Sequence, residues 1–202
     1  MNDLSIIIPC FNEEKNLIDI IDQLEIIKKN NIDINFEFIL VNNGSTDQTS
    51  ETLIKLNKNN ICKIIDLKNN LGYGGGILEG VRSASGTIIS WTHGDLQCDP
   101  YDIVKGYKLN KEKLLSNKCI VKGKRIKRKI MNTFFSNSMS IIASIIFGQK
   151  FFEINAQPKI FHRELINYFN DAPKDFSLDL FLLYISKKKF YEVIEQPVIY
   201  KK

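Results

Sequence analysis

The sequence predicts a single α/β domain with a doubly wound, mostly parallel sheet. Apolar runs rich in β-branched residues alternate with amphipathic segments through the first half of the 202-residue chain. Runs such as Ile6–Ile8 and Phe38–Val41 are continuously apolar, as strands buried on both faces of a parallel sheet require. Each run ends in a polar turn that opens a helix, which is typical of βαβ units.

The expected elements follow this alternation in order. The first half has expected strands at about 4–10, 36–42, 61–66 and 87–92 and helices at 13–29, 46–58 and 75–85. The second half has expected helices at about 101–113, 132–147, after His162 and 177–188, and strands at 118–122, 153–160 and 191–199. Two helix N-termini are indicated by cap residues that precede acidic ones: Asn12 before two glutamates, and Ser45 or Thr46 before Asp47. A cap oxygen accepts hydrogen bonds from free backbone N–H groups, and an acidic side chain interacts favourably with the positive end of the helix dipole.

Composition is that of a soluble globular domain, with 44% hydrophobic and 25% charged residues. No basic-then-apolar leader begins the chain, and Cys10, Cys62, Cys98 and Cys119 show no paired spacing. This pattern favours free thiols in a reducing cytoplasm. The longest apolar stretch, around Met139–Phe147, is well short of the roughly 20 residues of a membrane-spanning helix.

The positive charge is local. The net charge is +5, and six basic residues lie between Lys122 and Lys129, so the rest of the chain sums to −1. Such a patch suits nucleic acid, an anionic membrane surface or ligand phosphates, and a solvated loop is the simple alternative. The basic tract lacks interleaved aromatic residues, which makes a nucleic-acid partner the weakest of these options.

Polar side chains follow three of the expected strands where each one ends. Because the carboxyl ends of neighbouring parallel strands form the ligand crevice of an open α/β sheet, these segments are candidates for holding a nucleotide. After the fourth strand, Asp95, Gln97 and Asp99 alternate in an extended turn and present the oxygens that hard divalent cations bind. Mg²⁺ or Mn²⁺ is therefore the expected cofactor, and a surface turn capped by Asp99 is the alternative.

The glycine-rich segment 70–76 leads directly into a helix. Its backbone N–H groups suit an anion, although a tight turn explains the glycines equally well. The spacing matches neither a P-loop nor a dinucleotide fingerprint, which disfavours adenylate or dinucleotide use.

Several other titratable residues are candidates for acid or base chemistry. His93 is a candidate metal ligand or base, and a hydrogen-bonded residue in the wall of the site is the alternative. Glu153, Asp175 and Asp179 are candidate bases, and capping of the helix at 177 explains Asp175 at least as well.

Four segments together resemble the family-2 glycosyltransferases, which have the GT-A fold. The resemblance is to the branch of dolichyl-phosphate mannosyltransferase and bacterial polyprenyl-phosphate glycosyltransferases. The segments, which are similar to P-x-x-N-E, V-D-D-G-S-x-D, N-x-G and D-A-D-L-Q in that order, are 8–14, 41–47, 70–74 and 93–97. The resemblance implies one catalytic domain over 1–202, with a nucleotide-binding half at about 1–100 and an acceptor half at about 101–202.

The resemblance also implies roles for individual residues. Asp95 and Gln97 would hold the metal on the diphosphate, and Arg125 would meet an acceptor phosphate. The expected catalytic residues are these two, Asp95 and Arg125, together with the candidate base Asp179. The expected acceptor segment further includes Asn155, Gln157 and Lys159. The expected nucleotide-binding residues are Pro9, Phe11, Asn12, Glu13, Asn42, Asn43, Gly72, His93 and Gly94.

The chain departs from the family pattern at three positions. Asn42 and Asn43 stand where two aspartates are usual, and an amide donates as well as accepts hydrogen bonds. His93 stands where the first aspartate of D-x-D is usual.

The expected activity is inverting, metal-dependent transfer from a UDP- or GDP-type sugar to an acceptor. A core helix is the preferred interpretation of the apolar segment 132–147, and an interfacial helix at a membrane surface is the alternative. With the basic stretch before it, this segment favours a polyprenyl phosphate, on the cytoplasmic face of a membrane as a peripheral protein. Transfer to a sugar hydroxyl in cell-surface glycan synthesis, which needs a general base, and a catalytically idle nucleotide-sugar binding module are the alternatives.

Overall fold

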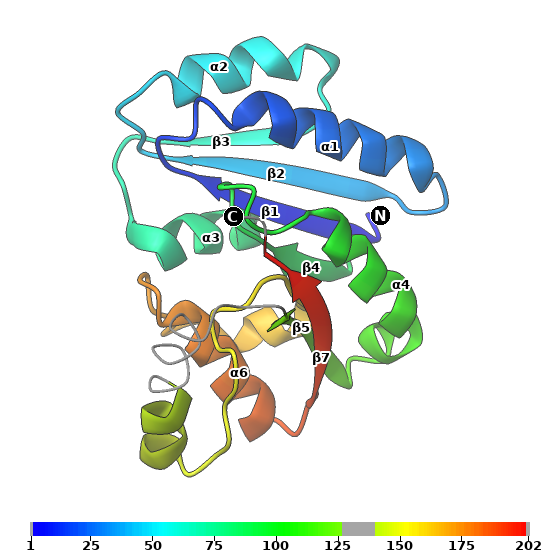
Figure 1. Cartoon of the computed structure of the whole chain (residues 1–202), viewed down its shortest axis with the longest axis vertical. Helices are drawn as coiled ribbons and strands as arrows, with labels where there is room; N and C mark the ends of the chain where they lie inside the picture. Colours follow the sequence, from blue (N-terminus) through cyan, green and yellow to red (C-terminus); the bar gives the residue numbers. More distant parts are fainter. Residues whose placement is uncertain (1, 127–139, 201–202) are drawn as a thin grey trace.

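A computed structural model describes residues 2–126 and 140–200 (Figure 1). Its sheet has seven strands in the order β3-β2-β1-β4-β6-β5-β7. Every neighbouring pair is parallel except the two pairs made by β6. The predicted doubly wound, mostly parallel sheet is confirmed, and it runs without a break through both halves of the chain. The strands are β1 Leu4–Cys10, β2 Phe36–Asn43, β3 Lys63–Leu67, β4 Ile88–Trp91, β5 Cys119–Ile126, β6 Lys159–His162 and β7 Glu192–Ile199.

Helices cover both faces of the sheet. One face packs against α1, α2 and α4 through the first core cluster, and the other packs against α3 and α6 through the second. The two clusters follow from alternation along a strand: Ile6 and Ile8 lie in one, and Ile7 lies in the other. The α-helices are α1 Leu17–Asn30, α2 Thr49–Leu56, α3 Gly72–Ser83, α4 Tyr101–Leu115 and α6 Leu178–Lys188, and a further helix runs over 140–147.

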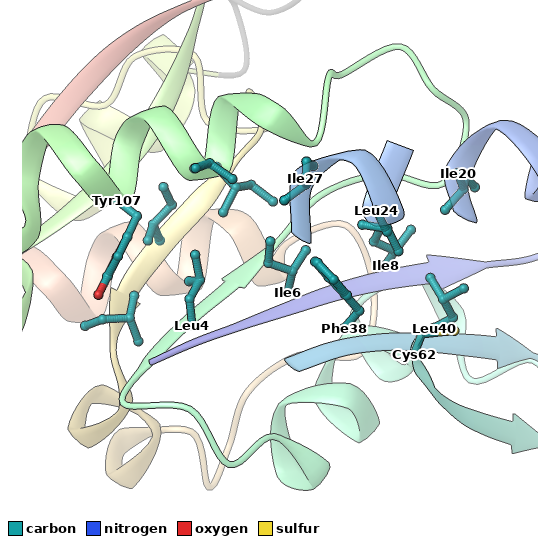
Figure 2. Close-up of a cluster of buried hydrophobic side chains, with 14 of the residues drawn as sticks. Leu4, Ile6, Ile8, Ile20, Leu24, Ile27, Phe38, Leu40, Cys62 and Tyr107 are labelled. Carbon is teal, nitrogen blue, oxygen red and sulfur yellow. The ribbon is translucent and has the colours of Figure 1, made fainter. Parts of the chain in front are cut away.

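The first cluster shows why α1 forms where it does. Its apolar residues recur at helical spacing, and Ile20, Leu24 and Ile27 all point onto the sheet (Figure 2). Tyr107 of α4 extends the same layer along β1 (Figure 2).

Several helices begin away from their expected caps. Helix α1 begins at Leu17 rather than at 13, because Asn12 has φ +58° and residues 13–16 form a turn. Helix α2 begins at Thr49 rather than 46. The residues that directly precede α1 and α2, Asn16 and Gln48, make no side-chain cap. Helix α3 begins at Gly72 rather than 75, so the glycines lie inside its first turns.

The expected strand at 153–160 is wrong for most of its length. Residues 153–158 form turns, and β6 covers only Lys159–His162. Pro158 has no N–H group to give to a strand ladder, and Glu153 has φ +45°. The expected helix at 132–147 is described only from residue 140, and Lys127, Arg128 and Lys129 of the basic tract also lie outside the described residues.

Among residues 2–126 and 140–200, no helix combines the length and apolarity needed to cross a membrane.

Candidate functional site

A cleft of about 440 Å³ opens at the carboxyl ends of three neighbouring strands, β2, β1 and β4. Ligands of doubly wound sheets bind in the crevice outside the carboxyl ends of the strands, and this cleft lies at that place. Its lining residues, which come from the three strand ends, the start of α3 and the segment before α6, are Pro9, Phe11, Glu13, Asn43, Asn70, Gly72, Tyr73, His93, Gly94, Asp95 and Phe176.

The structure brings eight of the expected site residues together in this cleft, namely Pro9, Phe11, Glu13, Asn43, Gly72, His93, Gly94 and Asp95. Gly94 is needed for the close approach of the segment after β4 to strand β1, because a Cβ there would lie 2.8 Å from the Pro9 carbonyl oxygen. Phe11 is 44% exposed beside Pro9. Together these two side chains give the cleft an open apolar edge.

Asparagine side chains hold the loops that shape the cleft. The Asn43 carboxamide accepts a hydrogen bond from the Leu71 N–H (3.0 Å) and donates to the Gly72 carbonyl (2.9 Å), which fixes the start of α3 against the end of β2. Asn12 accepts from the Thr46 N–H at 2.8 Å and so ties the turn after β1 to the turn after β2.

Asn12 and Asn42 were expected to bind nucleotide, but neither is among the residues that line the cleft. The Asn42 side chain is buried and donates to Asp66 at 2.5 Å.

Two carboxylates lie in the cleft. Asp95 follows β4, and its Oδ1 accepts a hydrogen bond from the Gln97 N–H (3.0 Å) while its Oδ2 lies 4.0 Å from Nδ1 of His93. Burial raises the pKa of Glu13, and the Asp95 charge adds to this shift while a hydrogen bond from Asn16 opposes it. The cleft therefore holds mutually repelling negative charge that a cation would compensate.

The donor set fits a divalent ion only in part. Within the described ranges, no group of three or more His, Cys, Asp or Glu side chains is arranged to hold a metal. Mg²⁺ commonly takes one or two protein carboxylates and completes its shell with water and substrate phosphates. Asp95 fits that pattern, whereas Gln97 is exposed and is not among the lining residues.

A buried polar network forms the inner wall of the cleft. The Tyr73 hydroxyl donates to Asp179 Oδ2 (3.2 Å), accepts from the Gln157 carboxamide (2.9 Å) and lies 3.3 Å from His93 Nε2. Trp91 also donates to Asp179, at 3.1 Å. Burial lowers the pKa of His93, although the carboxylates of Asp179 and Asp95 act in the opposite direction.

Lys159 and Asp179 form a fully buried ion pair behind this wall. Their nearest charged atoms are 3.3 Å apart, and the Lys159 ammonium also donates to the Ala156 carbonyl at 2.7 Å. Burial lowers the pKa of Lys159 to about 8, against the opposing effect of Asp179. Asp179 accepts hydrogen bonds from the side chains of Tyr73, Trp91 and Gln157 and pairs with Lys159. Its side chain is buried and is therefore not accessible as a base in this conformation.

The expected acceptor residues lie deeper than the sequence suggested. Gln157 and Lys159 are fully buried, so neither side chain can contact an acceptor in this conformation. Arg125 lies outside the cleft lining, where it pairs with Glu153 and packs over the Tyr200 ring at 5.3 Å. Asn155 keeps a buried side-chain oxygen without a hydrogen-bond partner among the described residues.

Tyr73 and Phe176 are cleft residues that the sequence prediction missed. Their rings stack with centroids 4.8 Å apart and join the glycine-rich start of α3 to the segment before α6. A bulky aromatic residue inside a run of glycines was the available signal for Tyr73. Phe176 gave no comparable signal, because its position depends on long-range packing.

Comparisons with known proteins agree on one family. A family model described as glycosyl transferase family 2 matches residues 5–177. Dodecaprenyl-phosphate galacturonate synthase of Rhizobium johnstonii is 32% identical over 103 residues, which are 50% of this chain and 30% of that protein. Poly-beta-1,6-N-acetyl-D-glucosamine synthase of Staphylococcus epidermidis is 28% identical over 113 residues, 53% of this chain and 26% of that protein.

The fold has close relatives among solved structures. Glucosyl-3-phosphoglycerate synthase from Mycobacterium tuberculosis, in complex with Mn²⁺, uridine diphosphate and glucosyl-3-phosphoglycerate, aligns with a TM-score of 0.75 at 18% identity. The alignment covers 100% of this chain and 72% of that one, whereas the chain spans less than a third of the two sequence relatives above.

Proposed function

The chain belongs to glycosyl transferase family 2, and on that premise we propose that it transfers a sugar from a nucleoside diphosphate sugar to a polyprenyl phosphate. The observation that carries the proposal is the cleft at the ends of β2, β1 and β4, which combines an apolar edge with the Asp95 and Glu13 carboxylates. UDP or GDP is the expected leaving group.

The proposed reaction is a single in-line displacement. An acceptor oxygen forms a bond to the anomeric carbon as the bond from that carbon to the diphosphate breaks, and the nucleoside diphosphate leaves with the electron pair. Catalysis of such a step consists mainly of positioning and of stabilising the charge on the leaving group. A prenyl phosphate oxygen is already anionic near neutral pH, so no general base is needed.

Different residues of the chain would bind the nucleoside, the diphosphate and the acceptor. Pro9, Phe11 and Glu13 would hold the nucleoside. Gly72 and Gly94 would let the chain approach the diphosphate closely. Asp95 would hold Mg²⁺ or Mn²⁺, and such an ion, when bound, neutralises charge on a diphosphate. Arg125, at the end of the sheet strand β5, is the proposed contact for the acceptor phosphate.

The buried network would act as a support rather than as a reactant. We assign Gln157, Lys159 and Asp179 to holding Tyr73 and His93, which line the cleft. This assignment differs from a base role for Asp179 and suits an acceptor that needs no base.

The name of the Rhizobium relative, a dodecaprenyl-phosphate galacturonate synthase, supports a polyprenyl-phosphate acceptor. The staphylococcal relatives are named as synthases of a polysaccharide, which supports transfer to a sugar hydroxyl as the second candidate. A membrane-surface location follows from a lipid acceptor and not from a hydroxyl acceptor.

The test is the release of nucleoside diphosphate from a panel of UDP- and GDP-sugars with Mn²⁺, in the presence of a short prenyl phosphate or its prenyl alcohol. We expect release with the phosphate only, and its loss in Asp95→Asn. Equal release with the alcohol, or release only with an oligosaccharide, would favour the hydroxyl acceptor. No release with any pair would support a binding module.

A further inference from the structure

We propose that residues 140–152 and the last turn of α6 form a docking site for an anionic membrane surface, in which a lysine-lined cavity receives lipid phosphate. The inference rests on the proposed function in one respect, since a lipid-phosphate acceptor would lie in that membrane. The argument depends on the described residues of this surface and not on the nucleotide cleft.

The helix at 140–147 turns its large apolar side chains outward. Ile141, Ile142, Ile145 and Ile146 are 57–75% exposed, while the small residues Ser140 and Ala143 are 5% exposed. Isoleucines at positions i, i+1, i+4 and i+5 share one face of a helix. This helix packs through Ser140, Ala143 and the ring of Phe147, which contacts Phe151 and Tyr184. It presents an isoleucine face outward, the reverse of an ordinary surface helix, so the expected core helix is wrong for residues 140–147.

The apolar surface continues beyond the helix. Phe152 is 61% exposed, and a cavity of about 490 Å³ is lined by Ile141, Ile145, Phe151 and Phe152 together with Ser140, Ser144 and Lys150. A contiguous apolar surface of this kind marks an interaction site, whereas single exposed apolar residues need no explanation.

A second cavity, of about 330 Å³, adjoins the first and shares Lys150, Phe151 and Phe152 with it. Its charged lining consists of Lys122, Lys150, Lys187 and Glu195. Glu195 lies 3.1 Å from the Lys122 ammonium and 2.8 Å from that of Lys124, so one carboxylate faces several ammonium groups. The cavity therefore carries an excess of positive charge.

Further lysines extend this positive rim. Lys187 packs over the Phe151 ring at 5.0 Å. The exposed Lys188 lies over the Tyr184 ring at 5.8 Å, and that ring packs against Phe147 at the end of the helix at 140–147. An apolar face with a lysine rim has the composition of an interfacial anchor, in which side chains enter the acyl boundary and ammonium groups meet phosphates.

A membrane is favoured over a second copy of the chain by charge. A symmetric dimer through this face would bring one lysine rim against another, and like charges across an interface are unfavourable. The surface also lies at one end of the long axis of the molecule, with α2 at the opposite end (Figure 1). This position lets the surface meet a bilayer while α2 points away from it.

The test is co-sedimentation of the chain with vesicles of phosphatidylcholine alone or with 30% phosphatidylglycerol, without nucleotide sugar or acceptor. We expect binding to the anionic vesicles only. Ile142→Asp/Ile145→Asp should lower the partition coefficient more than tenfold, and Lys150→Gln roughly fivefold. Ile54→Asp and Lys55→Gln, on exposed positions of α2, are the matched controls and should bind as the wild type does.

Equal binding by the Ile142→Asp/Ile145→Asp variant and the wild type, with both folded by circular dichroism, would overturn the proposal. Equal binding of the wild type to neutral and to anionic vesicles would contradict the proposal that the lysines bind lipid phosphate. A wild-type dimer that the isoleucine substitutions dissociate would instead assign the face to a second copy. Because no substrate is present, each result is independent of whether the chain transfers sugar.

Discussion

Tyr73 is the residue through which the two halves of the chain meet at the cleft. It stands at the start of α3, and its hydroxyl contacts His93 from the end of β4, Gln157 from the turn before β6 and Asp179 of α6. Gln157 joins the network through its carboxamide N–H groups, while its Oε1 is buried without a hydrogen-bond partner among the described residues. The wall of the cleft is therefore defined by groups that are distant in the sequence.

The open aromatic edge of the cleft leads to a prediction for Phe11. If the nucleobase stacks there, Phe11→Ala should weaken nucleoside diphosphate binding by about 1–3 kcal/mol, the usual effect of losing one base-stacking aromatic side chain. Isothermal titration with Mn²⁺ present measures this change. Phe190→Ala, at a position 95% exposed outside the cleft lining, is the control, and equal affinities for the two variants would exclude stacking on Phe11.

The buried ion pair leads to a prediction about pH. Since the pKa of Lys159 is lowered to about 8 in the folded chain, the unfolded chain holds more protons at this group between pH 8 and 10.5. The contribution of Lys159 to the free energy of unfolding should therefore rise with pH across that window. The free energy of unfolding of the wild type, compared with that of the variant Lys159→Met/Asp179→Asn, should rise by up to about 1.4 kcal/mol per pH unit.

Urea unfolding at pH 7.5, 8.5 and 9.5 measures the difference between the two proteins. The double variant removes both charges, so it avoids an uncompensated buried carboxylate, and groups shared by the two proteins cancel. A difference that stays constant over the three pH values would contradict the lowered pKa of Lys159.

At the scale of elements, α3 depends on small residues to approach the sheet. A Cβ at Gly80 would lie 2.4 Å from Cγ2 of Ile7 and 3.2 Å from Cγ2 of Val41. Gly80→Ala should therefore destabilise the chain by about 1–3 kcal/mol through overpacking, even though alanine is the better helix former.

A double-mutant cycle with Ile7→Ala tests this origin. In the Ile7→Ala background the branched side chain is gone, so the same Gly80→Ala change should lose most of its effect. Equal losses of unfolding free energy in both backgrounds would show that the backbone, and not the contact with Ile7, sets the requirement for glycine.

The sequence predicted elements well where apolar periodicity decides them. Strands β1, β2 and β7 match their expected positions within one residue at each end. For β1 and β2 the reason is a long apolar run that ends in a polar turn. The starts of α1 and α2 differ from expectation by three or four residues because polar residues that resemble caps hold loops together instead, as Asn12 does with Ser45 and Thr46. Helix α3 begins three residues early because its glycines are helical and do not form a separate turn. The segment 153–158 does not extend β6, because Pro158 has no N–H group for the strand ladder and Glu153 has φ +45°.

At the scale of the whole molecule, the sheet order explains both what the sequence predicted of the site and what it missed. Strand-end motifs at β1, β2 and β4 predicted seven of the eight expected cleft residues, since adjacent parallel strands bring their ends together. The eighth, Gly72, came from the glycine-rich segment that begins α3. The antiparallel β6 between β4 and β5 places Gln157 and Lys159 behind this cleft. Burial of that kind depends on long-range packing, which local sequence patterns do not encode.

The central claim is that the cleft binds a nucleoside diphosphate together with a divalent ion held by Asp95. A thermal-shift panel of UDP, GDP, CDP and ADP, each with and without Mn²⁺, tests it most directly. At a ligand concentration of 100 times Kd, binding adds about 2.7 kcal/mol, or roughly 5–10 °C in Tm for a chain of this size. The control variant is Asp22→Asn, at an exposed position of α1.

We predict a metal-dependent rise in Tm with UDP or GDP that persists in Asp22→Asn and disappears in Asp95→Asn. The amide of that variant keeps an oxygen for the Gln97 N–H while losing the negative charge. No rise with any of the four nucleotides, or a rise that Asp95→Asn leaves intact, would contradict the account.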